Sequence, residues 1–275
     1  MEARLAQRFE AAAPGGQDIA YGASPLQHID FWRAKAAAAD APLVLFVHGG
    51  GWTRGDKRNA TGATKVTHYL DLGYAFASIN YRLVPDATVE QQAQDVADAV
   101  AALVARAKAL GFDPRKVVLM GHSAGAHLSA LVGTDMRYLE KAGLGPDSLA
   151  GVIPLDGAAY DVPRQIAEGG QFMHDTYLRA FGDDAARQRA LSPTFQATRP
   201  NAPAFLILHV ARTDGTAQSQ ALAQALGRAG TPAQVQGFDG NGLRGHMEIN
   251  RRLGDPDYPA TAVVDVWLKR VFAGR

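Results

Sequence analysis

Residues 117–128 read VVLMGHSAGAHL, and this stretch decides the fold. Four apolar residues lead into Gly121-His122-Ser123-Ala124-Gly125 and an apolar segment follows, which predicts a strand, a sharp turn and a helix. Glycines two residues before and two after the serine remove side chains that would collide in such a turn. The N–H of Ala124 and the helix N-terminus would then face any negative charge that develops beside Ser123. The pattern predicts Ser123 as a nucleophile.

Other parts of the chain alternate in the same way between strand and helix. Short continuous apolar runs predict strands buried on both faces: Leu43–Val47, Tyr74–Ile79, Val117–Met120, Gly151–Leu155 and Ala204–Val210. Helical spacing favours helices over about Thr88–Leu110, Asn59–Leu72, Ala124–Arg137, Ala217–Ala229 and Pro259–Phe272. The pattern predicts an α/β fold with a mostly parallel central sheet and helices on both faces.

The longest predicted helix carries signals at both ends, and two further segments flank the regular pattern. Thr88 and Gln91 form a capping box, and Gly111 stands where a C-terminal cap belongs. An early strand containing Ile29 and Phe31 is expected near the sheet edge. Residues 161–203 mix aromatic residues, charges and prolines, which predicts an insertion of short helices forming a small cap within a single domain, residues 1–275.

A second glycine cluster follows the predicted strand Leu43–Val47 and reads HGGGW, residues 48–52. Backbone amides there could complete an oxyanion hole, which we assign to Gly50, Gly51 and Ala124. His48 is expected to brace the loop. Trp52 and His122 are the candidates for substrate binding, with packing in the core as the alternative for Trp52. A phosphate-binding loop is poorly supported because neither a Gly-Lys-Ser/Thr sequence nor a Gly-x-Gly-x-x-Gly sequence opening a helix is present.

A serine nucleophile needs a base and an orienting carboxylate. His246 is the only histidine after residue 209, and it follows a glycine-rich segment, residues 239–245, that predicts a mobile loop. We expect Asp214 to be the carboxylate, because it follows the strand Ala204–Val210. Asp156 and Asp239, which follow other predicted strands, stay open as alternatives.

Composition narrows the function classes. The 28 Lys and Arg against 27 Asp and Glu give no basic excess, so no nucleic-acid partner is expected. The absence of cysteine excludes disulfides, thiolate metal sites and a cysteine nucleophile. A zinc site of the His-Glu-x-x-His type does not fit around His246, so neither metal nor cofactor is expected. Residues 1–10 lack the pattern of a signal peptide and no apolar run could span a bilayer, which favours a cytoplasmic protein. Oligomeric state is left open.

With these residues in place, the chain resembles α/β-hydrolases of the esterase/lipase group. The resemblance rests on residues 48–52, on Asn80-Tyr81-Arg82-Leu83, on residues 121–128 and on the region of His246. It is similar to a branch of small carboxylesterases, feruloyl or acetyl esterases and arylformamidases. The resemblance implies a serine carboxylesterase acting on small or aromatic esters. An arylformamidase and a non-catalytic binding protein of the same fold are the alternatives.

Overall fold

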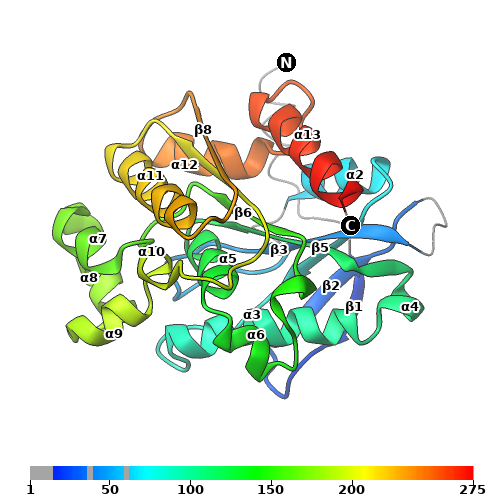
Figure 1. The fold of residues 1–275 in the computed structure, drawn as a ribbon, viewed down its shortest axis with the longest axis horizontal. Helices are drawn as coiled ribbons and strands as arrows, with labels where there is room; N and C mark the ends of the chain where they lie inside the picture. Colours follow the sequence, from blue (N-terminus) through cyan, green and yellow to red (C-terminus); the bar gives the residue numbers. More distant parts are fainter. Residues whose placement is uncertain (1–14, 36–39, 59–61, 275) are drawn as a thin grey trace.

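A central sheet of eight strands runs through the residues that the structure, a computed structural model, describes, namely 15–35, 40–58 and 62–274 (Figure 1). Its strand order is β1-β2-β4-β3-β5-β6-β7-β8. Strands β1 and β2 pair antiparallel, as do β2 and β4, and the other neighbours pair parallel. The strands are β1 (Gln17–Ala20), β2 (His28–Trp32), β3 (Ala41–Val47), β4 (Ala75–Ile79), β5 (Phe112–His122), β6 (Gly151–Leu155), β7 (Phe205–Val210) and β8 (Ala233–Phe238).

The parallel strands are buried on both faces, as their continuous apolar runs predict. In β3, Leu43, Leu45 and Val47 join one hydrophobic core. Val44 and Phe46 point the other way and join a second core. This alternation is the two-residue repeat of a strand that is covered on both sides.

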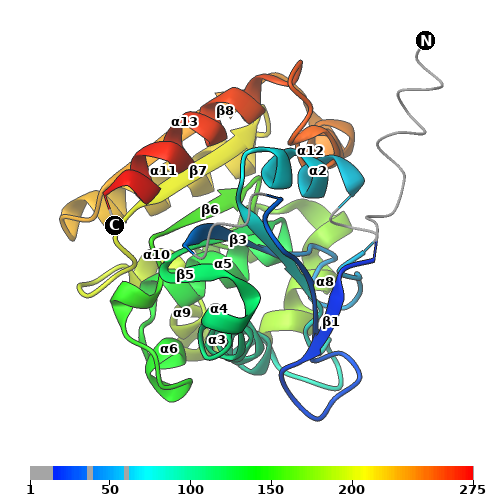
Figure 2. The same cartoon turned by 90° about the vertical axis from the view of Figure 1, so that its right-hand side faces the viewer.

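Helices cover both faces of the sheet. In Figures 1 and 2, α2 and α13 lie on one side and α3 and α5 on the other. The helices are α2 (Ala63–Asp71), α3 (Val89–Val104), α4 (Ala107–Leu110), α5 (Ala124–Thr134), α6 (Arg137–Lys141), α7 (Val162–Glu168), α8 (Gly170–Phe181), α9 (Ala185–Ala190), α10 (Pro193–Gln196), α11 (Thr213–Arg228), α12 (Gly242–Arg252) and α13 (Pro259–Ala273), with a 3₁₀ turn at Pro146–Ser148. Among the described helices, none is both long enough and apolar enough to cross a bilayer.

The helix predicted over about residues 88–110 is divided in the structure. The capping box is confirmed: the Thr88 side chain accepts from the Gln91 amide, and the Gln91 side chain accepts from the Thr88 amide. The helix α3 ends at Val104, and the short α4 ends at Leu110. Gly111 caps α4 with a φ of 77°, which confirms the expected C-terminal cap. The apolar repeat therefore identified the buried face and missed the break.

The N-terminal part of the sheet differs most from expectation. The early strand near the edge is confirmed as β2, and β1, which the sequence did not indicate, lies outside it. Three of the four residues in β1 are exposed, so it has little apolar patterning to detect. Two expectations lie outside the described residues: the character of residues 1–10, and residues 59–61 of the predicted helix Asn59–Leu72.

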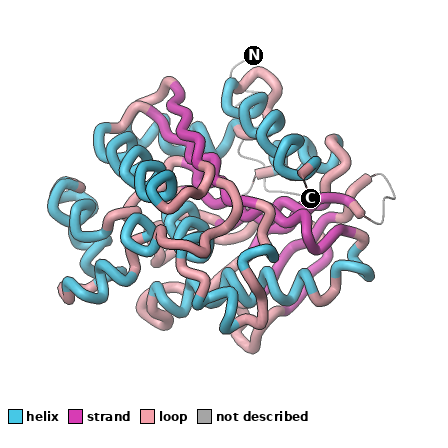
Figure 3. Tube along the Cα trace, in the orientation of Figure 1, coloured by secondary structure: helices cyan, strands magenta, loops and turns pink. Residues whose placement is uncertain are grey.

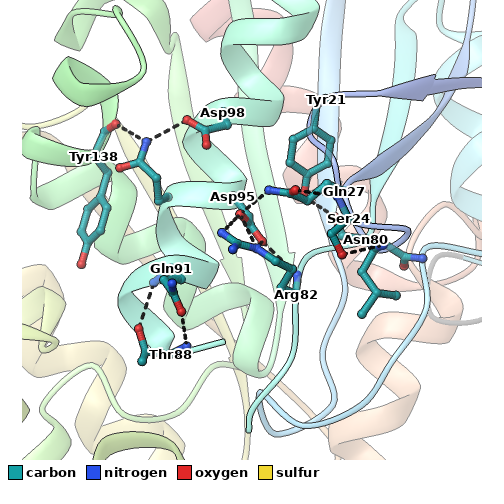
Figure 4. A network of polar contacts seen from close by, with 12 residues as sticks. Tyr21, Ser24, Gln27, Asn80, Arg82, Thr88, Gln91, Asp95, Asp98 and Tyr138 are labelled. Atoms are coloured by element: carbon teal, nitrogen blue, oxygen red, sulfur yellow. Dashed lines mark hydrogen bonds and ion pairs between the residues drawn. The ribbon is translucent and has the colours of Figure 1, made fainter. Parts of the chain in front are cut away.

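A polar network fastens the segment after β4 to the rest of the domain (Figure 4). Arg82 donates from Nε and Nη2 to the fully buried carboxylate of Asp95, which also accepts from Gln27. The neighbouring Tyr81 hydroxyl donates to the carbonyl of His48 across 2.9 Å. Because an ionised buried carboxylate is costly unless it is paired, this network holds the chain next to His48 in one conformation.

The insertion predicted at residues 161–203 consists of short helices, α7 to α10 (Figure 3). Phe181 of α8 packs edge-on against Trp52, with ring centroids 4.7 Å apart. Arg187 of α9 makes two hydrogen bonds to Glu90 at the start of α3, at 2.7 and 2.8 Å. The insertion is thus joined to the domain by both apolar and charged contacts.

Candidate active site

Ser123 occupies a strained turn between β5 and α5. Its φ of 56° and ψ of −118° lie outside the regions that side chains ordinarily allow. A Cβ added to Gly121 would lie 2.1 Å from the carbonyl oxygen of Gly125, and one added to Gly125 would lie 2.1 Å from that of Val47. Both positions therefore require glycine. Such a conformation costs on the order of 1–3 kcal/mol, and the surrounding backbone maintains it.

The glycine loop after β3 lies directly beside this turn. Val47 pairs with Gly121 across the parallel strands β3 and β5, so both strands end at the same edge of the sheet. A Cβ added to Gly49 would lie 2.9 Å from the Cβ of Ser123. Gly50 and Gly51 have φ of 132° and 59°, which only glycine adopts without strain. The structure thus brings the two predicted loops together.

His48 is buried beneath this loop. Its Nδ1–H donates to the Gly49 carbonyl at 2.8 Å, and its ring stacks on Tyr81 with centroids 4.4 Å apart. Burial lowers the pKa of His48 to about 4, against the weaker opposing effect of the bond to Gly49. A neutral, packed imidazole of this kind suits a bracing role better than proton transfer.

His246 makes a short hydrogen bond to a buried carboxylate. Its Nδ1–H donates to Asp156 Oδ2 at 2.6 Å. This bond assigns the ring proton to Nδ1 and leaves a lone pair on Nε2, the form that a general base needs. Contrary to the expected mobile loop, His246 lies in helix α12. A Cβ on Gly245 would lie 2.6 Å from the Gly240 carbonyl carbon, so this glycine serves a close backbone crossing.

Asp156 directly follows strand β6 and is fully buried. Besides the bond from His246, its Oδ1 accepts from the Val210 amide at 3.1 Å, and Arg212 Nε lies 3.0 Å from its Oδ2. Burial raises the pKa of Asp156, but the His246 hydrogen bond and the Arg212 charge outweigh it, so the pKa is lowered overall. The group is a carboxylate at neutral pH.

The expected pairing of Asp214 with His246 is corrected by the structure. Asp214 stands in the first turn of α11, where its Oδ2 lies 3.6 Å from Arg212 Nη1 and accepts from Gln165 Nε2 at 3.3 Å. Its side chain is 30% exposed. Asp214 follows β7, which pairs with β6, the strand that precedes Asp156. The expected carboxylate therefore lies at the correct edge of the sheet but after the neighbouring strand. Asp239, the other alternative, is exposed.

The two residues expected to bind substrate, His122 and Trp52, are both buried. His122 Nε2–H donates to the His246 carbonyl at 2.9 Å, and the two rings lie 4.5 Å apart. Burial and the neighbouring His246 lower the pKa of His122 well below its usual value. Trp52 is 1% exposed, and its Nε1–H donates to His127 Nδ1 at 3.3 Å. Trp52 is therefore a core residue, the alternative that the sequence left open.

Ala124, the third residue expected in the oxyanion hole, begins α5 directly after the serine. Its amide thus belongs to the first turn of that helix, where backbone N–H groups lack intrahelical partners. Within residues 15–35, 40–58 and 62–274, no group of three or more His, Asp or Glu side chains is placed to hold a metal ion. The chemistry that the arrangement supports is attack by a serine with an imidazole base.

Known proteins are similar to this chain in sequence and in fold. A family model described as BD-FAE matches residues 29–145. Esterase LipC of Mycobacterium tuberculosis (strain ATCC 25618 / H37Rv) is 32% identical over 203 residues, which cover 70% of this chain and 50% of LipC. The chain thus spans about half the length of that relative.

Solved structures extend the similarity over nearly the whole chain. Esterase B from Lactobacillus Rhamnosis (HN001) superposes with a TM-score of 0.75 at 23% identity, covering 99% of this chain and 90% of that one. The propionate-bound esterase Est2 of Thermogutta terrifontis has a TM-score of 0.73 at 20% identity, with coverage of 94% and 95%. The sheet order and these similarities show that the chain has an α/β-hydrolase fold and is similar to proteins that are called esterases.

Proposed function

We propose that this protein is a carboxylic ester hydrolase that uses Ser123, His246 and Asp156. The observation that carries the proposal is the 2.6 Å hydrogen bond from His246 Nδ1 to a buried carboxylate, while the His246 ring packs against His122, the residue that precedes the strained Ser123. LipC and Est2, which are called esterases, support the reaction class. The pairing supplies a base with a free Nε2, and the turn supplies a nucleophile.

In the proposed mechanism, Ser123 Oγ attacks the ester carbonyl carbon while His246 Nε2 takes the hydroxyl proton. The Gly50, Gly51 and Ala124 amides stabilise the oxyanion, and each such donor contributes about 3 kcal/mol to the transition state. When the tetrahedral intermediate collapses, His246 returns the proton to the leaving alcohol and an acyl-enzyme remains. Water then attacks the acyl carbon with His246 again as base, which releases the acid and restores Ser123.

We further propose that the chain is one domain and that the insertion, residues 161–203, is a small cap limiting the substrate to small or aromatic esters. A Cβ added to Gly51 would lie 3.1 Å from Thr176 Cγ2 of α8, so this helix packs against the proposed oxyanion loop. Since Phe181 and Arg187 also bind the insertion to the domain, it forms a fixed wall beside that loop.

The test replaces the nucleophile. Ser123→Ala should reduce hydrolysis of p-nitrophenyl acetate on the order of 10⁴-fold or more, because the covalent route is lost. Ser129→Ala, a matched change in a buried serine of the same helix α5, should leave hydrolysis nearly unchanged. A fluorophosphonate probe should add its mass to the wild type and the Ser129 variant alone. Undiminished hydrolysis by Ser123→Ala would refute the mechanism. Faster turnover of N-formylkynurenine than of short esters would instead favour an arylformamidase.

A further inference from the structure

Two side chains approach the same oxygen of the buried Asp156. His246 Nδ1 lies 2.6 Å from Oδ2, and Arg212 Nε lies 3.0 Å from it. The arginine comes from the short connection between β7 and α11, whereas the histidine comes from α12. A general base whose carboxylate partner is shared with a permanent cation feels less negative charge than one with an unshared partner.

The Arg212 contact is Coulombic rather than a hydrogen bond. Despite the 3.0 Å separation, the Nε–H of Arg212 is not aligned with an acceptor, so the hydrogen bond to Oδ2 belongs to His246. The Arg212 side chain is only 17% exposed, which limits screening by solvent. Its other end is held by the Gly157 carbonyl, which accepts from Nη2 at 3.3 Å.

Asp214 completes a row of alternating charges. Its Oδ2 lies 3.6 Å from Arg212 Nη1, so it offsets part of the arginine charge. The row runs from Asp214 to Arg212, then to Asp156 and His246. Asp214, which the sequence suggested as the catalytic carboxylate, is thus part of this row but contacts Arg212 instead of His246.

We propose that Arg212 and Asp214 are positioning residues that set the basicity of His246 through Asp156. This inference rests on the proposed function of His246 as the base. Arg212 weakens the hold of Asp156 on the imidazolium that forms during the reaction, and Asp214 moderates Arg212. The hold of His246 on its proton then depends on both of these charges.

Among the described residues, the other ionisable groups near His246 make no ion pair with Asp156. His122 packs against its ring, and its pKa is lowered well below the usual value, chiefly by burial. Lys65 of α2 donates to the Asn250 carbonyl at the far end of α12, and burial lowers its pKa to about 7. Burial raises the pKa values of Tyr160 and Tyr258, whose charges would act on Asp156, so both are neutral.

The experiment measures the acid limb of kcat/KM for p-nitrophenyl acetate from about pH 5 to pH 9, where that limb reports the base of the free enzyme. Arg212→Met should move the limb upward by roughly half a unit to one unit, because Asp156 then stabilises the imidazolium fully. Asp214→Asn should move it downward by a smaller amount. The double variant should fall between the two. Arg228→Met, an exposed change of equal charge on α11, should leave the limb in place.

A second measurement does not depend on catalysis. In the Ser123→Ala background, the His246 ring proton can be titrated by NMR, and Arg212→Met and Asp214→Asn should shift its midpoint in opposite directions. Since Asp214 is partly exposed, its variant keeps the test available if Arg212→Met does not fold. Midpoints that stay fixed, or that move in the same direction, overturn the inference. A failed hydrolysis assay with shifted midpoints would overturn the proposed function alone.

Discussion

Two aspartates that follow neighbouring strands, Asp156 and Asp214, were candidates for the carboxylate beside His246. They differ in their burial and in their contacts. Asp156 directly follows the apolar strand β6, has no exposed surface and accepts from both His246 and the Val210 amide. Asp214 lies in the first turn of α11, a position where the helix dipole favours any carboxylate. In the sequence, both are simply aspartates that follow strands. Burial distinguishes them, and burial depends on residues that are far away in the chain.

Exchanging each carboxylate for an amide tests this assignment. Asp156→Asn should lower kcat on the order of 10⁴-fold, because an amide holds the wrong tautomer of His246. Asp214→Asn, the matched change, should cause a far smaller loss at the pH plateau. Steady-state kinetics with p-nitrophenyl acetate, alongside thermal unfolding to verify that both variants fold, gives the comparison. A larger loss for Asp214→Asn than for Asp156→Asn would return the role to Asp214.

At the scale of elements, the clarity of the apolar pattern decides what could be predicted. The strands β3, β4, β6 and β7 contain continuous apolar runs, and each was expected within two residues of its ends. Helix α12 was missed because Gly242 and Gly245 are poor helix formers. It forms because Ile249, which is fully buried, anchors it to the core. Tertiary packing there outweighs local propensity.

The contact between α8 and the glycine loop predicts selection by size. Thr176→Ala should increase kcat/KM for longer esters relative to p-nitrophenyl acetate by roughly threefold to tenfold, since each methylene group accommodated gains about 0.8 kcal/mol. Series that vary the acyl group and the alcohol separately show which side of the ester gains. Asp175→Ala, an exposed change on the same helix, is the control. A profile identical to the wild type in both series would exclude Thr176 as a limit on size.

For the molecule as a whole, buried neutral histidines make stability depend on pH. Burial lowers the pKa values of His48 and His127 to about 4, whereas an unfolded histidine titrates near 6.5. As the pH falls from about 6.5 to 4, the unfolded chain binds protons that the folded chain does not, so stability present above pH 6.5 is lost across this window. Each histidine accounts for up to about 3 kcal/mol.

Urea unfolding at several values between about pH 7.5 and pH 4.5 measures this loss. The free energy of unfolding should decrease by several kcal/mol over that range. His127→Phe removes one of the two groups, so its stability should depend less steeply on pH even though it loses the hydrogen bond to the Leu191 carbonyl. A slope equal to that of the wild type would contradict the assignment of His127 as a neutral buried group.

The sequence by itself determined the central parallel strands, several of the helices beside them, the turn at Ser123 and the glycine loop. These follow from apolar periodicity and from backbone positions that only glycine can occupy, both of which are local properties. Only the tertiary structure decided which carboxylate meets His246, that His246 lies on a helix, and that Trp52 packs against the insertion. Those outcomes depend on burial and on contacts between residues such as Asp156 and His246, 90 positions apart.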